Sequence, residues 1–195
     1  MEDLPIQLLE VATGTAVEAI LRARLPVEVV VATEALWKPY RRAIPGAEHA
    51  HWDWRAKIGR LAIPGARVMG IECCGAIEGM ALVFDSGYFA RLEPSVGRPL
   101  VYVDFLEAAP WNLRRFVPDP RFRGAGQSLM AAAARLSECL GYDGRVGLHA
   151  LEQSEDYYAR ACQMSTLGPD REYNDLWYFE WTADAAGRFV REVGQ

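Results

Sequence analysis

A short segment rich in arginine and glycine, RFRGAG at residues 121–126, directly precedes the part of the chain that is most typical of a helix. The first turn of a helix has unpaired backbone N–H groups and a partial positive charge, so it binds phosphate where no Cβ blocks the approach. Gly124 and Gly126 lack a Cβ, and Arg121 and Arg123 add positive charge at the same place. The segment therefore predicts a phosphate site at a helix N-terminus.

Two well-known phosphate motifs do not fit this segment. The dinucleotide fingerprint G-x-G-x-x-G requires a third glycine where the chain has Leu129, and the P-loop requires a Gly-Lys-Ser/Thr run, which the chain lacks. Arg114 and Arg115 lie just upstream, so arginines gather here although the net charge of the chain is −5. The alternative interpretation is structural, with glycines that end a loop and arginines that are solvated.

Side chains that can transfer protons lie on both sides of this segment. Asp104 and Glu107 lie in the run LVYVDFLEA, residues 100–108, and Tyr157 is followed by Tyr158. A carboxylate that faces a cleft can act as a general base, and a phenol with a pKa of about 10 can act as a general acid. A packing or surface role is the alternative for each of them.

The elements that position these residues follow from the hydrophobic pattern. Residues 66–74 and 76–85 are β-rich and predict a hairpin at Gly75, and residues 100–108 predict a strand that stops before Pro110. In that strand, alternation places Leu100, Tyr102 and Asp104 on one face and Val101, Val103 and Phe105 on the other. The best helix is predicted over residues 124–140. The later elements expected are strands over 145–151 and 175–181, a short helix over 154–162 with Ser154 as its N-cap, and a helix from Thr182.

The N-terminal third is harder to interpret, and composition limits the possible partners. VEVVVA at 27–32 is typical of a strand, and helices are expected around 34–43 and 49–62. A net charge of −5 and a pI near 5.3 argue against nucleic-acid binding. No apolar run is long enough for a membrane span, and no signal pattern is present, so we expect a cytoplasmic protein. The cysteine and histidine spacings match no zinc pattern, so we expect no metal. We therefore expect one α+β domain over residues 1–195.

Residues 121–126 resemble the Q/R-x-x-G-x-G/A signature of the GNAT superfamily of N-acetyltransferases, in which the signature also lies between a strand and a long helix. The resemblance covers about residues 66–181 and leaves residues 1–65 as a variable, acceptor-side part. It implies a mixed, mostly antiparallel central sheet flanked by helices. The connection over 110–120 is longer than is usual in this family.

The resemblance implies acetyl-CoA as a co-substrate. The backbone from Arg123 to Ser128 would hold its pyrophosphate, and main-chain groups of Phe105 and Leu106 would pair with its pantetheine arm. The cofactor-binding residues expected in this way are Phe105, Leu106, Arg121, Arg123, Gly124, Ala125, Gly126, Gln127 and Ser128.

The resemblance also implies direct acetyl transfer to an amine of a small molecule or a peptide. Amines are mostly protonated at neutral pH, so a base must remove a proton, and the leaving thiolate needs an acid. We favour Asp104 as the base, with Glu107 as the alternative if a bulge changes the parity of the strand, and Tyr158 as the acid. A covalent mechanism with Cys162 and His149 is not favoured, since no third orienting group is evident.

Two other functions are kept as alternatives: a catalytically silent module that binds acyl-CoA, and an enzyme that uses the loop for a nucleotide phosphate. A homodimer is left open. The aromatic cluster HWDW at 51–54, together with Trp37 and Trp111, has the helical spacing of core residues and is more typical of packing than of an acceptor pocket.

Overall fold

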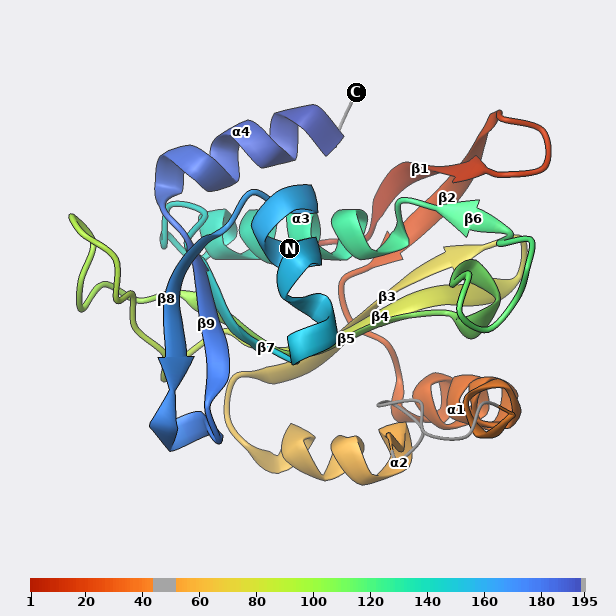
Figure 1. The fold of residues 1–195 in the computed structure, drawn as a ribbon, viewed down its shortest axis with the longest axis horizontal. Helices are drawn as coiled ribbons and strands as arrows, with labels where there is room; N and C mark the ends of the chain where they lie inside the picture. The colour runs from red at the N-terminus through yellow and green to blue at the C-terminus, as the bar shows by residue number, and fades with distance from the viewer. Residues whose placement is uncertain (44–51, 194–195) are drawn as a thin grey trace.

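The computed structural model of the chain describes residues 1–43 and 52–193. These residues form one nine-stranded sheet in the order β6-β1-β2-β3-β4-β5-β7-β9-β8, in which only β5 and β7 pair in parallel (Figure 1). The predicted α+β fold with a mixed, mostly antiparallel sheet is confirmed. The strands are β1 (Leu4–Glu10), β2 (Ala16–Arg22), β3 (Ala66–Cys73), β4 (Ala76–Phe84), β5 (Val101–Ala108), β6 (Phe122–Arg123), β7 (Val146–Ala150), β8 (Ser165–Asp170) and β9 (Leu176–Trp181).

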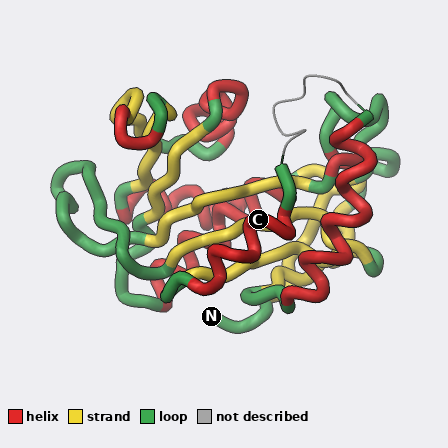
Figure 2. The backbone as a smooth tube through the Cα atoms, turned by 90° about the horizontal axis from the view of Figure 1, so that it is seen from below, coloured by secondary structure: helices red, strands yellow, loops and turns green. Residues whose placement is uncertain are grey.

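Helices cover both faces of the sheet, α3 and α4 on one face and α1 and α2 on the other (Figure 1). Each pair of helices closes its own apolar core against the strands, which run side by side as one continuous layer (Figure 2). The α-helices are α1 (Val27–Arg42), α2 (Trp54–Lys57), α3 (Ala125–Cys139) and α4 (Ala183–Val193). Short helical turns are Ile58–Ala62, Pro110–Asn112, Glu152–Ser154 and Arg171–Tyr173, and Tyr157–Ala161 is a π-helix.

Most elements predicted for the central and C-terminal parts are confirmed. The hairpin is β3–β4, the strand over 100–108 is β5, and the long helix is α3, which Gly141 follows in a left-handed conformation with φ +77°. The two later strands are β7 and β9, and α4 follows them. Ser154 belongs to a 3₁₀ turn, and the helix after it is a π-helix that its side chain does not cap.

The prediction of a strand over residues 27–32 is wrong, because this segment forms the first turns of α1. Val30, Glu34, Trp37 and Arg41 are buried at helical spacing, so burial of one helix face outweighs the strand propensity of the valines. The helix predicted around 34–43 is the rest of α1.

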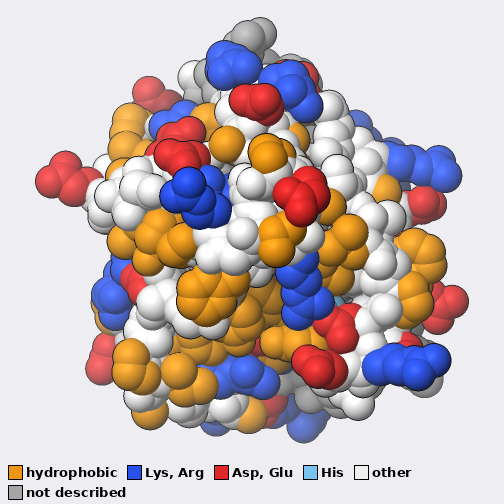
Figure 3. Space-filling model, turned by 90° about the vertical axis from the view of Figure 1, so that its left-hand side faces the viewer, with side chains coloured by type: hydrophobic (Ala, Val, Ile, Leu, Met, Phe, Trp, Pro, Cys, Tyr) orange, Lys and Arg blue, Asp and Glu red, His pale blue; other side chains and the backbone are white. Residues whose placement is uncertain are grey.

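The remaining differences concern residues 49–62, the first two strands and the edge strand β8. The helix predicted over 49–62 is reduced to α2 and a 3₁₀ turn, and residues 44–51 lie outside the described part. The hairpin of β1 and β2 had no clear sequence signal. The edge strand β8 had none either, because it contains Gly168 and Pro169. The end of the sheet that carries β8 shows hydrophobic side chains in its middle with charged ones around them (Figure 3). No described helix has the length and apolar character needed to cross a bilayer.

Candidate functional site

A β-bulge at Asp104 changes the direction of the side chains that follow it in β5. The register with β4 steps from Val103 to Phe105, so Asp104 has no opposing residue there. Phe105 and Glu107 consequently lie on the same face as Tyr102. The prediction that Phe105 shares a face with Val103 is therefore wrong, and the parity change considered for Glu107 does occur.

The parallel strands β5 and β7 separate just before this bulge. They pair from Val101↔Val146 to Val103↔Leu148 and no further within the described chain. A cavity of about 690 Å³ opens where the strands diverge, between the second half of β5, the start of α3 and the segment after β7. Its size is in the range of small-molecule sites.

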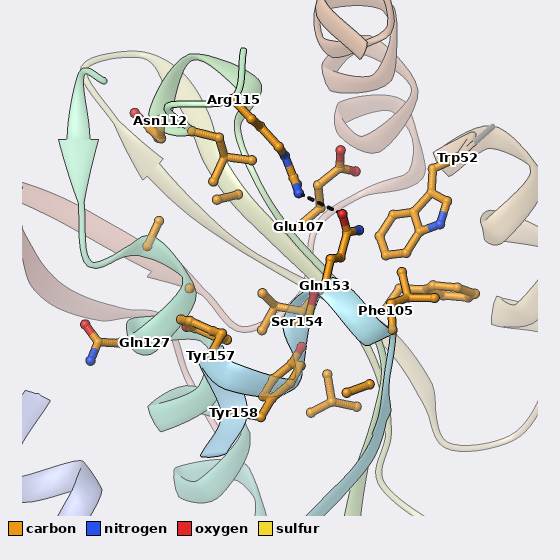
Figure 4. A pocket seen from close by; sticks show the side chains of 18 of the residues that line it. Trp52, Phe105, Glu107, Asn112, Arg115, Gln127, Gln153, Ser154, Tyr157 and Tyr158 are labelled. Atoms are coloured by element: carbon orange, nitrogen blue, oxygen red, sulfur yellow. Dashed lines mark hydrogen bonds between the residues drawn. The ribbon is translucent and has the colours of Figure 1, made fainter. Parts of the chain in front are cut away.

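The cavity brings together most of the residues that the sequence singled out. Asp104 lines it, as do Glu107 and Tyr158 (Figure 4). Arg121 and Ser128 lie outside it: Arg121 turns toward the Glu78 carboxylate, 3.7 Å away, and the Ser128 N–H donates to the Gly124 carbonyl at 2.8 Å. The predicted cofactor-binding residues that line the cavity are Phe105, Leu106, Arg123, Gly124, Ala125, Gly126 and Gln127.

The first turn of α3 presents backbone N–H groups at one end of this cavity. Gly124 is the N-cap and has φ +99°, a left-handed conformation that favours glycine. Since Ser128 is the first residue whose N–H bonds back to the cap carbonyl, helical geometry leaves the N–H groups of residues 125–127 without an intrahelical acceptor. Arg123 directly precedes the cap and lines the cavity, so this end suits an anion. Arg114 and Arg115 also line the cavity.

The two tyrosines of the π-helix approach the cavity from the side of β7. Tyr158 is 8% exposed and its ring packs against Phe179 at 6.0 Å and Tyr157 at 5.2 Å. Burial, followed by the nearby Cys162 thiol, raises the pKa of Tyr158 above the usual range of a phenol. Its hydroxyl therefore stays protonated at physiological pH and can act as a donor.

Asp104 and Glu107 differ in how their carboxylates are held. The Arg41 Nη1 donates to Glu107 Oε1 at 3.0 Å and Oε2 at 3.1 Å, and Trp54 Nε1 donates to Oε2 at 2.7 Å. Asp104 is paired with Arg60, whose Nη1 lies 3.1 Å from its Oδ2. Burial raises the pKa of both carboxyls, an effect that these cations partly oppose.

Comparison with known proteins identifies the architecture. No protein-family model matches the chain, and no curated protein matches it in sequence. A protein provisionally assigned as an acetyltransferase superposes with a TM-score of 0.58 and 15% identity over 90% of this chain and 91% of that one. YncA from Salmonella typhimurium, solved with its cofactor acetyl-CoA, gives 0.51 and 11% over 85% and 94%. A GNAT-family acetyltransferase from Streptococcus pneumoniae gives 0.50 and 11% over 84% and 98%.

The chain has the fold of the GNAT acetyltransferases. At these identities the likeness concerns the fold. Within this GNAT fold, the signature glycines also have structural roles. A Cβ at Gly126 would lie 2.5 Å from the Tyr157 hydroxyl oxygen, so this glycine makes room for a tyrosine that packs on the start of α3.

The long connection over residues 110–120 is anchored by a residue that the sequence analysis missed. Glu78 of β4 is fully buried, and its Oε2 accepts from Trp111 Nε1 at 2.7 Å and Asn112 Nδ2 at 2.8 Å. Asn112 Oδ1 in turn accepts from the Phe122 N–H at 2.9 Å, which fixes the strand before α3. Farther along the connection, Arg115 Nη1 reaches Gln153 Oε1 at 3.4 Å (Figure 4).

The buried ion pairs behind the cavity were also missed, since nothing in the sequence pairs α1 with β5. Arg41 Nη2 donates to Glu34 Oε2 at 2.5 Å and thereby joins two carboxylates. Trp37 and Trp54 are fully buried, as expected for packing residues, whereas Trp52 lines the cavity and His51 lies outside the described residues. An arginine on an apolar helix face is the signal that could have indicated a buried carboxylate partner.

His149 and Cys162 do not form a nucleophile pair. His149 Nδ1 bonds to the Tyr102 hydroxyl at 2.7 Å, and its Nε2 bonds to Asp170 Oδ2 at 3.0 Å, so both ring nitrogens are engaged. Burial raises the pKa of the Cys162 thiol to about 12, which disfavours a thiolate.

Proposed function

We propose that the protein is an N-acetyltransferase that transfers an acetyl group, or a related short acyl group, from its CoA thioester directly to an amine. The gap between β5 and β7 carries this proposal. At one end it has N–H groups of α3 without an intrahelical acceptor, and Asp104 and Tyr158 also line it. The fold shared with acetyltransferases supports it.

The residues around the gap fit the chemical parts of acetyl-CoA. The first turn of α3 and Arg123 suit a pyrophosphate, because backbone donors, the helix dipole and a guanidinium converge there. The edge of β5 after Val103 suits the amides of pantetheine, which would pair with it as an added strand. Arg121 and Ser128 are not part of this proposed contact, because they lie outside the cavity. The bound thioester would supply the activated acyl group.

Proton transfer is assigned to two side chains of the cavity. Asp104 would take the proton of the attacking amine, directly or through water, and the Tyr158 hydroxyl would donate to the departing sulfur. Glu107 is less suited to be the base, since three hydrogen bonds from Arg41 and Trp54 already occupy its oxygens. The acceptor is an amine of a small molecule or a peptide, and the expected compartment is the cytoplasm.

Calorimetric titration with acetyl-CoA and with ATP tests the first part of this proposal. Tighter binding of ATP would contradict it and favour the nucleotide enzyme. A thiol-release assay over a panel of amines then tests turnover. Binding of acetyl-CoA without thiol release for any amine would favour the catalytically silent module.

A further inference from the structure

The Lys57 amine lies against two aromatic rings of the cavity lining. Its Nζ lies 3.4 Å from the ring centroid of Phe105 and 4.1 Å from that of Trp52, and both rings line the cavity. The two rings meet edge to face at 5.4 Å. Phe105 directly follows the bulged Asp104, so this amine lies beside the part of β5 where the strands have separated.

The Lys57 amine faces aromatic rings and has no ion-pair partner among the described residues. Asp104 pairs with Arg60 and Glu107 pairs with Arg41, and no carboxylate of the described chain is within ion-pair distance of the Lys57 amine. Burial lowers the pKa of Lys57 to about 8, although Glu107 and Asp104 act in the opposite direction. At mildly alkaline pH a large fraction is therefore the neutral, nucleophilic amine, whereas an ordinary lysine has a pKa of about 10.4.

Lys57 is also chemically distinct within the sequence. The chain contains two lysines, Lys38 and Lys57, among its 21 cationic Lys and Arg side chains. Lys38 is held by Asp53, whose Oδ2 lies 2.5 Å from its Nζ. Lys38 is therefore an internal control for Lys57, from which it differs in ion pairing and in position.

We propose that Lys57 is an acceptor of this protein's own acyl group, so that the chain acetylates itself at this residue. The step rests on the proposed function. The neutral Nζ attacks the thioester carbonyl carbon, an N–C bond forms and the C–S bond breaks. The amine proton passes to Asp104 or solvent, and the sulfur leaves as a thiol after taking a proton. The amide product is stable, so the reaction stops at one acetyl group per chain.

Intact-mass analysis of the full chain after incubation with acetyl-CoA tests this inference, with the acetylated residue assigned from proteolytic fragments. We expect one added acetyl group at Lys57, formed about tenfold or more faster than at Lys38. The rate should saturate with acetyl-CoA, fall when excess free CoA competes, and rise with pH up to about 8. Lys57→Arg should abolish the mass shift, and Lys38→Arg should retain it.

The outcomes separate this inference from the proposed function. Acetyl-CoA binding and acetylation of an external amine without modification of Lys57 would overturn the inference alone. A Lys57 rate that stays linear in acetyl-CoA, or that is unaffected by free CoA, would show chemical acetylation without a bound thioester and would also overturn it. If the calorimetric titration shows no binding of acetyl-CoA, both this inference and the proposed function are overturned.

Discussion

The Tyr157 hydroxyl occupies the space that a side chain at position 126 would need, 2.5 Å from the place of its Cβ. Gly126→Ala should therefore push this tyrosine away from the start of α3. We expect a loss of about 1–3 kcal/mol in the free energy of unfolding, measured by urea denaturation, and weaker acetyl-CoA binding.

The matched variant for this effect is Tyr157→Phe, which removes the atom nearest to the added methyl group. Combined with Gly126→Ala, it should restore part of the lost stability. If the double variant is as unstable as the sum of the two single ones, the contact is not the cause.

Tyr158→Phe tests the proposed acid. We expect kcat to fall by roughly 10²-fold with little change in the KM for acetyl-CoA, because only a hydroxyl along the cavity is removed. Since burial raises the pKa of Tyr158, deprotonation of this residue should not limit activity at moderately alkaline pH. Measurements of kcat against pH check this. Tyr157→Phe is the control, and an equal loss of kcat in both variants would contradict the assignment.

Asp104→Asn should raise the stability of the protein and lower its activity. Burial raises the pKa of this carboxyl, so the folded state disfavours its ionised form, and the associated stability is present at low pH and lost as the pH rises. The amide of the Asp104→Asn variant does not ionise, so the variant keeps this stability as the pH rises. We expect the variant to unfold at higher urea than the wild type at neutral pH while thiol release falls. Glu107→Gln is the comparison, and a larger loss of kcat there would make Glu107 the base.

Arg41→Met should destabilise the fold through the carboxylates that it leaves behind. Arg41 is fully buried between Glu34 and Glu107, so its removal leaves uncompensated buried charge. We expect a loss of about 3–5 kcal/mol in the free energy of unfolding. Adding Glu107→Gln to this variant should recover part of the loss, and an additive loss would argue against coupling.

Lys57→Met should raise stability in a pH-dependent way. The folded pKa of Lys57 is lowered to about 8, so below that pH the wild type carries a buried charge that the variant lacks. The advantage of the variant should be largest at pH 7 and shrink as the pH rises from about 8 toward the reference lysine pKa of about 10.4. Thermal unfolding across this range measures it. A constant difference between the two proteins would show that burial of the charge is not responsible.

Local patterns predicted the hairpin, β5, α3 and the C-terminal elements, because turn residues and periodicity act over a few neighbours. They failed at residues 27–32, where the partners that bury one helix face are distant in sequence. The bulge at Asp104 depends on register with β4, and the engagement of Glu107 depends on Arg41, which is 66 residues away. Residue type and family resemblance indicated Asp104, Glu107 and Tyr158, and all three line the cavity. Their catalytic roles stay predictions.

The separation of β5 from β7 divides the sheet into two parts that few hydrogen bonds connect. Strands β6 to β5 form one hydrogen-bonded block and β7, β9 and β8 another; in the described chain, β5 and β7 join them in parallel at Val101–Val103. A molecule whose amides fill the gap would form hydrogen bonds with both blocks and so connect them. Occupancy of the site would then set how stiffly the halves of the molecule move against each other.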